Sequence, residues 1–230
     1  MISLVHLYPR ELGINGDVGN VTALRRRAQW RGADVEVLNV GAGDDLPAHA
    51  HLVHIGSGPA SARQPLHADV ARHASTLRAW AADGVPFLAI TAGWQLLGRE
   101  VTELDGTVST GAGVFPSSAR VVAERTVGEV AGESELGEVA GFVNYGAETT
   151  VDEGVTCLVR LSDSDEGIVT GDLVATHLHG PFLPMNPVWA DRLLEAAAYR
   201  AGVRLGDPDP KLTVIDDYAR RSRAAIRSRL

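Results

Sequence analysis

The first half of the chain alternates short apolar runs with longer segments of helical period. Runs rich in Val, Ile and Leu predict strands at residues 2–7, 34–39, 52–55 and 86–90. Alternating strands and helices are typical of a three-layer α/β domain with a mainly parallel sheet and helices on both faces. Apolar spacings of three, four and seven predict buried helix stripes at Val21, Leu24 and Ala28 and at Leu66, Val70, Leu77 and Trp80.

The pattern changes after Gly98. Gly-, Thr- and Val-rich pieces at residues 107–114, 119–122 and 155–161 predict short antiparallel strands that extend or flank the parallel core. Asn186-Pro187 predicts a helix start, since Asn is a favoured N-cap and Pro suits the first helical position. The buried stripe of that helix would be Trp189, Leu193 and Ala197.

The C-terminal segment is set apart by a Pro-rich breaker and by its charge. The sequence Asp207-Pro208-Asp209-Pro210 predicts a last helix from about Val214 to the C-terminus. We therefore expect one domain over residues 1–205, with residues 206–230 forming a basic helix packed on it or extending it. Five arginines and no acid follow Tyr218, so the helix either meets an acidic partner or is simply solvated.

Composition and charge exclude several classes of protein. The chain has 230 residues, and 21 Lys+Arg against 29 Asp+Glu give a net charge of −8, which argues against nucleic-acid binding through phosphate contacts. A single cysteine, Cys157, excludes an internal disulfide framework and a cysteine-based zinc cluster. No run approaches the roughly 18 apolar residues of a membrane span, and the N-terminus lacks a signal pattern. We expect a cytoplasmic protein.

Three segments carry residues suited to chemistry. An apolar strand runs directly into small residues and a helix at positions 85–98, which is the layout of a nucleophile elbow with Thr91 at its tip. His177 and His179 are two residues apart and would face the same way in a strand, so either could act as a base or both could bind a metal. The loop Gly56-Ser57-Gly58-Pro59 could offer backbone donors to an anion or form an ordinary turn. A fourth segment, at residues 16–20, is interpreted as a turn and N-cap.

Taken together and in order, the motifs resemble class I glutamine amidotransferases of the cobyric-acid-synthase type. Among these, they resemble in particular the glutamine amidotransferase subunits of lipid II isoglutaminyl synthases, over about residues 5 to 200. The motifs are Leu7-Tyr8-Pro9, Gly16-Asp17-x-Gly19-Asn20, Ile55-Gly56-Ser57-Gly58, Ala89-Ile90-Thr91-Ala92-Gly93-Trp94-Gln95-Leu96-Leu97-Gly98, Gly141-Phe142-x-Asn144, Thr176-x-Leu178-His179-Gly180-Pro181 and Leu183-Pro184-x-Asn186-Pro187.

The resemblance implies a flavodoxin-like fold, a mechanism and a set of site residues. In that family a cysteine thiolate attacks the glutamine side-chain amide, a histidine moves protons, and ammonia passes to a synthetase. Carried over by position, Thr91 is the nucleophile position and His179 the histidine. Oxyanion or substrate-binding roles fall on Gly56, Ser57, Gly58, Ala92 and Gln95. The expected partners are glutamine and an ATP-dependent, Mur-ligase-like subunit of peptidoglycan amidation, with no cofactor and no metal.

Two departures from the family pattern affect the expected activity. Threonine at position 91 replaces the family's cysteine, and a hydroxyl is far less ionised near neutral pH than a thiol. Threonine is also β-branched and suits a strained elbow poorly. In the Gly-rich loop, Pro59 has no N–H to donate. Cys157 is remote in sequence and gives no reason to be treated as a replacement nucleophile.

These departures leave three hypotheses open. The first is an amidotransferase subunit by descent whose glutaminase activity is lost or weak and which is retained to bind or regulate a partner. The second is a working glutaminase that uses Thr91, or one whose cysteine at this position has been altered. The third is a different hydrolase with a hydroxyl nucleophile at Thr91 and His179 as its base.

Overall fold

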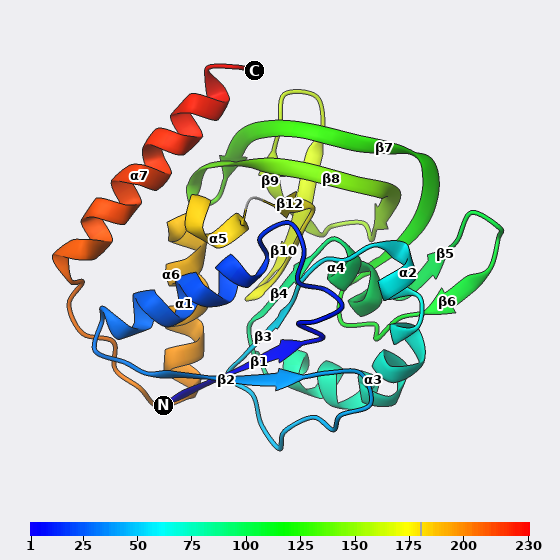
Figure 1. Ribbon diagram of the computed structural model, residues 1–230, viewed down its shortest axis with the longest axis horizontal. Coiled ribbons are helices and arrows are strands. Elements are labelled where there is room, and N and C mark those ends of the chain that lie inside the picture. Colours follow the sequence, from blue (N-terminus) through cyan, green and yellow to red (C-terminus); the bar gives the residue numbers. More distant parts are fainter. Residues whose placement is uncertain (180) are drawn as a thin grey trace.

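The computed structural model describes residues 1–179 and 181–230. Its centre is a mixed sheet in which β2, β1, β3, β4 and β11 lie side by side and parallel (Figure 1). The predicted strands of the first half are confirmed to within a residue or two. The parallel strands are β1 (Ile2–Leu7), β2 (Val35–Val40), β3 (Leu52–Ile55), β4 (Phe87–Ile90) and β11 (Leu173–Thr176).

Helices cover both faces of this parallel half because successive strand residues point to opposite sides. Leu4 faces the helices α1 (Val18–Gln29) and α6 (Pro187–Arg200), whereas the next residue, Val5, faces α3 (Leu66–Ala82) and α4 (Ala92–Leu97). The predicted stripes of α1, α3 and α6 are buried in these two clusters. The three-layer α/β fold with a mainly parallel sheet is therefore confirmed.

Antiparallel strands extend the sheet beyond β11, as predicted, but one of the predicted strands is much longer than expected and its partner β8 was not predicted. The prediction of short strands is wrong here because the segment at 119–122 belongs to β7, 18 residues long, which forms a hairpin with β8 that arches over the sheet edge (Figure 1). Much of β7 is partly exposed and lacks strict alternation, so its length follows from pairing with β8. The strands are β7 (Ser117–Ser134), β8 (Gly137–Val151), β9 (Thr156–Arg160), β10 (Asp165–Thr170) and β12 (Leu178–His179), with β5 (Glu100–Thr102) and β6 (Val108–Thr110) beside β7.

The start of α6 is confirmed, but the side chain of Asn186 does not cap the helix. It is fully buried, accepts a hydrogen bond from the Ala140 N–H at 3.0 Å, and donates to the carbonyls of Ala140 and Phe182 at 3.0 and 2.9 Å. Asn186 therefore ties β8 to the short helix α5 (Phe182–Met185) and to the start of α6.

The last helix, α7 (Pro210–Arg227), begins four residues earlier than predicted. The Asp209 side chain accepts a hydrogen bond from the Lys211 N–H at 2.8 Å, and Pro210 occupies the first turn, so the breaker itself caps the helix. α7 contacts α5, β7 and β8. Figure 1 shows this helix along one side of the molecule. Its arginines, and Arg229 just after its end, pair with acidic residues of this chain: Arg220 and Arg221 with Asp217, Arg223 with Glu138, Arg227 with Glu133 and Glu138, and Arg229 with Glu129.

Candidate active site

Thr91 occupies the sharp turn between β4 and α4. Its φ of 43° and ψ of −95° are unusual for a β-branched residue, a strain that costs about 1–3 kcal/mol and is typical of functional turns. The Thr91 N–H donates to the Thr176 carbonyl at 2.9 Å, and the Gly93 N–H donates to the Gly56 carbonyl at 3.0 Å. A Cβ at Gly93 would lie 2.7 Å from that same carbonyl oxygen, so the small residue is required for the close approach.

Both histidines of the predicted pair face the Thr91 hydroxyl. His179 Nε2 lies 3.2 Å from Thr91 Oγ1, and His177 Nδ1 lies 3.4 Å from the same oxygen. His179 comes from β12, which pairs with β8 through Phe142, whereas His177 lies between β11 and β12. The i, i+2 spacing therefore brings the two rings to one point. Gly180, which belongs to the same motif, lies outside the described residues.

Asp17 stands behind His179 and is fully buried. Its Oδ1 is 3.5 Å from His179 Nδ1, and neither atom has a hydrogen-bond partner within residues 1–179 and 181–230. Its Oδ2 accepts the Ser57 N–H at 2.6 Å. Burial raises the pKa of Asp17, while the His179 ring and the Ser57 N–H oppose that rise. Thr91, His179 and Asp17 thus have the geometry of a nucleophile, a base and an orienting acid.

The position of Asp17 behind His179 was not recognised from sequence. The segment at residues 16–20 predicts a turn and N-cap, and Asp17 does occupy the N-cap position of α1, but its side chain makes no capping hydrogen bond. It faces Ser57 and His179 instead. The signal was present only in the ordered motifs of the resemblance, because nothing local to residues 16–20 indicates contact with a histidine 162 positions after Asp17.

A cavity of about 470 Å³ opens in front of Thr91. Of the site residues named from sequence, Ser57, Gly58, Thr91, Ala92 and Gln95 line it. His179 has no exposed surface and lies behind the Thr91 hydroxyl, and the Gly56 carbonyl is bonded to Gly93. The candidates from three separate loops are therefore gathered at one cavity or directly behind it.

The Ser57 N–H is not aimed at Thr91. It donates to Asp17, so this part of the Gly-rich loop orients the acid behind His179. Gly58 and Ala92 remain beside Thr91 on the cavity wall, and Ala92 is the first residue of α4, where helical N–H groups are unpaired within the helix. An oxyanion role for their N–H groups stays a prediction.

Arg125 was missed by sequence reasoning and supplies a cation to the cavity wall. Its Nε and Nη2 donate to the Asn144 side-chain oxygen at 3.1 and 2.6 Å, which fixes the guanidinium beside the opening. Arg63 also lines the cavity, but its side chain is only 2% exposed and pairs with Glu103 at 2.7 Å. Arg125 therefore has the better access to an anionic group of a bound molecule.

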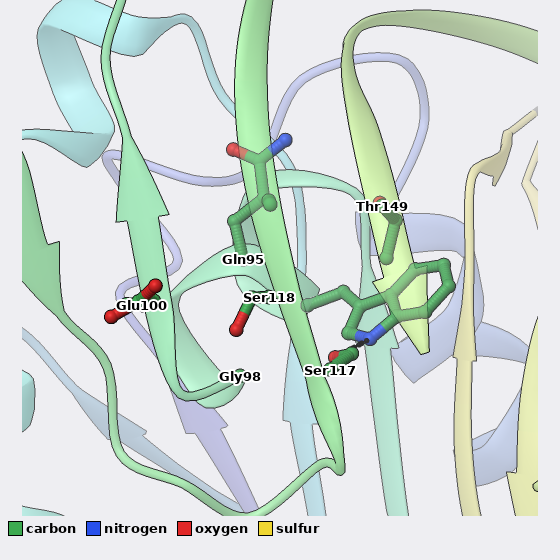
Figure 2. A pocket seen from close by; sticks show the side chains of 8 residues that line it. Gln95, Gly98, Glu100, Ser117, Ser118 and Thr149 are labelled. Carbon is green, nitrogen blue, oxygen red and sulfur yellow. Dashed lines mark hydrogen bonds between the residues drawn. The ribbon is translucent and has the colours of Figure 1, made fainter. Parts of the chain in front are cut away.

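A second cavity of about 500 Å³ lies on the other side of His177 and Tyr145. Its lining includes Trp94, whose indole N–H donates to Ser117 Oγ at 2.9 Å. Figure 2 shows the neighbouring pocket, which Gln95, Ser117 and Thr149 help to line. Cys157 also lines this second cavity rather than the one that contains Thr91, and burial raises the pKa of its thiol. Cys157 does not take the place of a nucleophile at the elbow.

The fold and the elbow define a glutamine-amidotransferase-like protein. Residues 3–187 match the CobB/CobQ-like glutamine amidotransferase domain, and the chain belongs to this family. The chain is 30% identical to the lipid II isoglutaminyl synthase (glutamine-hydrolyzing) subunit GatD of Staphylococcus aureus strain N315, over 88% of this chain and 86% of that protein. The corresponding subunit of Streptococcus pneumoniae R6 is 27% identical, over 85% and 80% of the two chains.

Solved structures agree on the fold. A crystal structure of a glutamine amidotransferase superimposes with a TM-score of 0.60 at 19% identity, covering 84% of this chain and 98% of that one. Over the part of the chain that the structure describes, no helix is long and apolar enough to cross a membrane. Within the same residues, no three His, Cys, Asp or Glu side chains are grouped so as to hold a metal ion.

Proposed function

We propose that this chain is the glutamine-binding subunit of a two-component ligase that amidates a peptidoglycan precursor, and that its own glutamine hydrolysis through Thr91 is weak. The observation that carries the proposal is the Thr91 hydroxyl at 3.2 Å from His179, with Asp17 behind the ring. The relatives named lipid II isoglutaminyl synthase subunits support the substrate class, since they match along most of their length.

The geometry of the cavity supports the following course of glutamine hydrolysis. Thr91 Oγ attacks the side-chain amide carbon of glutamine, and its proton moves to His179 Nε2. The tetrahedral intermediate collapses when His179 gives that proton to the departing nitrogen, which releases ammonia and leaves a glutamyl ester on Thr91. Water then attacks the ester with His179 as base, which yields glutamate and restores the hydroxyl. Arg125 is suited to hold the α-carboxylate during these steps.

The threonine makes the attack slow. An unperturbed thiol has a pKa near 8.5 and is partly ionised at neutral pH, whereas an aliphatic hydroxyl is almost entirely protonated. His179 lies within reach of the Thr91 hydroxyl and can remove its proton as the oxygen attacks, but the hydroxyl is not ionised beforehand. The ammonia is useful when a ligase consumes it, so the proposed partner is an ATP-dependent, Mur-ligase-like subunit.

The proposal is tested by ammonia release from L-glutamine by the purified chain, Thr91→Cys and Thr91→Val. We expect low turnover in the unmodified chain and a gain of at least about tenfold in Thr91→Cys. Thr91→Val, which keeps the shape of the side chain but removes the hydroxyl, should show no turnover. Turnover that survives in Thr91→Val contradicts Thr91 as the nucleophile. Fast turnover by the unmodified chain contradicts the prediction that its glutaminase activity is weak. If none of the three proteins releases ammonia, the proposed glutaminase activity itself is contradicted.

A further inference from the structure

We propose that His177 donates a hydrogen bond to Thr91 Oγ and stabilises the negative charge that develops on this oxygen as it attacks. The proposal rests on the proposed function, because it assigns a second histidine to the same nucleophile. This hydrogen bond would compensate in part for the low acidity of the hydroxyl that stands where the family has a cysteine thiol.

The ring of His177 is held rigidly. It stacks on Tyr145 with 4.2 Å between centroids and an interplanar angle of 20°, and Trp94 lies on it at 4.8 Å. The His177 backbone N–H donates to Glu166 Oε1 at 2.6 Å. The side chain is nearly buried, with Nδ1 toward Thr91 and Nε2 at 3.2 Å from Thr149 Oγ1. The orientation needed for a directed hydrogen bond is therefore already set.

The direction of the hydrogen bonds follows from the acid at the far end. In its carboxylate form, which the Ser57 N–H and the His179 ring favour against the effect of burial, Asp17 only accepts hydrogen bonds. It accepts from Ser57 through Oδ2, so the His179 nitrogen that faces Oδ1 then carries the hydrogen. The other His179 nitrogen, Nε2, is then the acceptor for the Thr91 hydroxyl.

The Thr91 hydroxyl has one hydrogen, and His179 receives it. The contact between Thr91 Oγ1 and His177 Nδ1 is then satisfied only when His177 donates. His177 Nε2 becomes an acceptor, which matches the Thr149 hydroxyl beside it. Burial lowers the pKa of His177 to about 3, with the neighbouring His179 as the second cause, so the ring is neutral and has a single N–H to place.

A fixed N–H aimed at the oxygen that becomes charged is worth more to a hydroxyl than to a thiol. For comparison, removing one donor to the substrate oxygen that becomes charged in acyl transfer typically lowers kcat by about 10²–10³-fold. A thiol ionises with a pKa near 8.5 without that help. The value of His177 should therefore depend on which residue occupies position 91.

The first experiment measures which nitrogen of His177 carries the hydrogen, using long-range ¹H–¹⁵N correlation spectra of the histidine rings, assigned with a His177→Phe variant. We expect Nδ1–H on His177 and Nδ1–H on His179. A hydrogen on His177 Nε2 overturns the inference. This readout requires no turnover, so it stands apart from any failure of the proposed glutaminase.

The second experiment is a double-mutant cycle with glutamine hydrolysis as the readout. His177→Phe keeps an aromatic ring between Tyr145 and Trp94, and we expect it to lower kcat about 100-fold with little change in KM when Thr91 is present. In the Thr91→Cys background the loss should be less than about tenfold. Equal losses in both backgrounds assign His177 a structural role and overturn the proposal.

Discussion

The parallel and antiparallel halves of the sheet contribute different parts of the candidate site. The parallel half supplies the Thr91 elbow after β4, the Gly56–Gly58 loop after β3, and Asp17 after β1, all at the carboxyl ends of strands, where α/β sheets place their sites. The antiparallel half supplies His179 through the pairing of β12 with β8, and Arg125 from β7.

The residues from the parallel half are positioned by local sequence, whereas those from the antiparallel half are positioned by long-range strand pairing. The elbow and its glycines are encoded within a few residues, because a strand followed by small residues and a helix forms the turn locally. The proposed base, His179, and the cation, Arg125, reach Thr91 only through pairings between distant strands, such as that of His179 with Phe142. The halves must therefore be held in register for the proposed chemistry to occur.

The largest effect is expected where one side chain joins the two halves. Asn186→Ala leaves the N–H and carbonyl of Ala140 on β8 without their side-chain partner, and each buried unsatisfied group costs about 1–3 kcal/mol. We expect the free energy of unfolding in urea to fall by several kcal/mol. Val188→Ala, at a partly exposed position two residues later, is the control and should change it by less than about 0.5 kcal/mol. Similar values for the two variants contradict the tie.

Two glycine substitutions compare the tightly packed elbow with the open hairpin. Gly93→Ala places a Cβ 2.7 Å from the backbone oxygens of Gly56 and Ile55, and overpacking of this kind costs about 1–3 kcal/mol. The same change at Gly128 on β7 meets nothing within 4 Å and should be nearly neutral. Thermal unfolding of both variants measures the difference. If Gly128→Ala is as destabilising as Gly93→Ala, close backbone approach is not what the elbow glycine provides.

The same comparison explains how far sequence reasoning could reach. Strands such as residues 2–7 and 52–55 were predictable because they are fully buried apolar runs, and the elbow was predictable because it is local. The hairpin was not, since partly exposed residues of β7 carry no periodic signal and their strand state depends on β8. Asp17 and Arg125 were missed for a related reason: their partners, His179 and Asn144, are brought close only by the fold.

Two buried histidines in the parallel half should make the stability of the fold depend on pH. His6 and His54 stack at 5.2 Å on adjacent strands, and burial lowers their pKa values from 6.5 to about 4 and about 3. The unfolded chain binds protons near pH 6.5 and the folded chain does not, so stability is complete above pH 6.5 and falls as pH drops toward these folded values. At pH 5 the loss is about 2 kcal/mol for each ring relative to pH 7.5.

Replacement of one ring should reduce this pH dependence. We expect His54→Phe to lose about 2 kcal/mol less than the unmodified chain between pH 7.5 and 5, as measured by urea unfolding at each pH. The hydrogen bond from His54 to the Leu88 carbonyl is lost at both pH values, so it does not enter the difference. Val127→Ala, on the exposed part of β7, is the control and should keep the original slope. An unchanged slope in His54→Phe means that the buried rings do not set the acid sensitivity.

The smallest effect is expected at the basic end of α7. Arg229 pairs with Glu129 of β7, but both side chains are substantially exposed, and such ion pairs contribute little. Ile226, three residues earlier, is only 6% exposed, and its truncation to valine should cost about 1 kcal/mol. We therefore expect Arg229→Ala to leave the melting temperature in physiological salt unchanged, while Ile226→Val lowers it. A larger loss of melting temperature in Arg229→Ala than in Ile226→Val would mean that the ion pair with Glu129, rather than the burial of Ile226, holds the end of α7 to the hairpin.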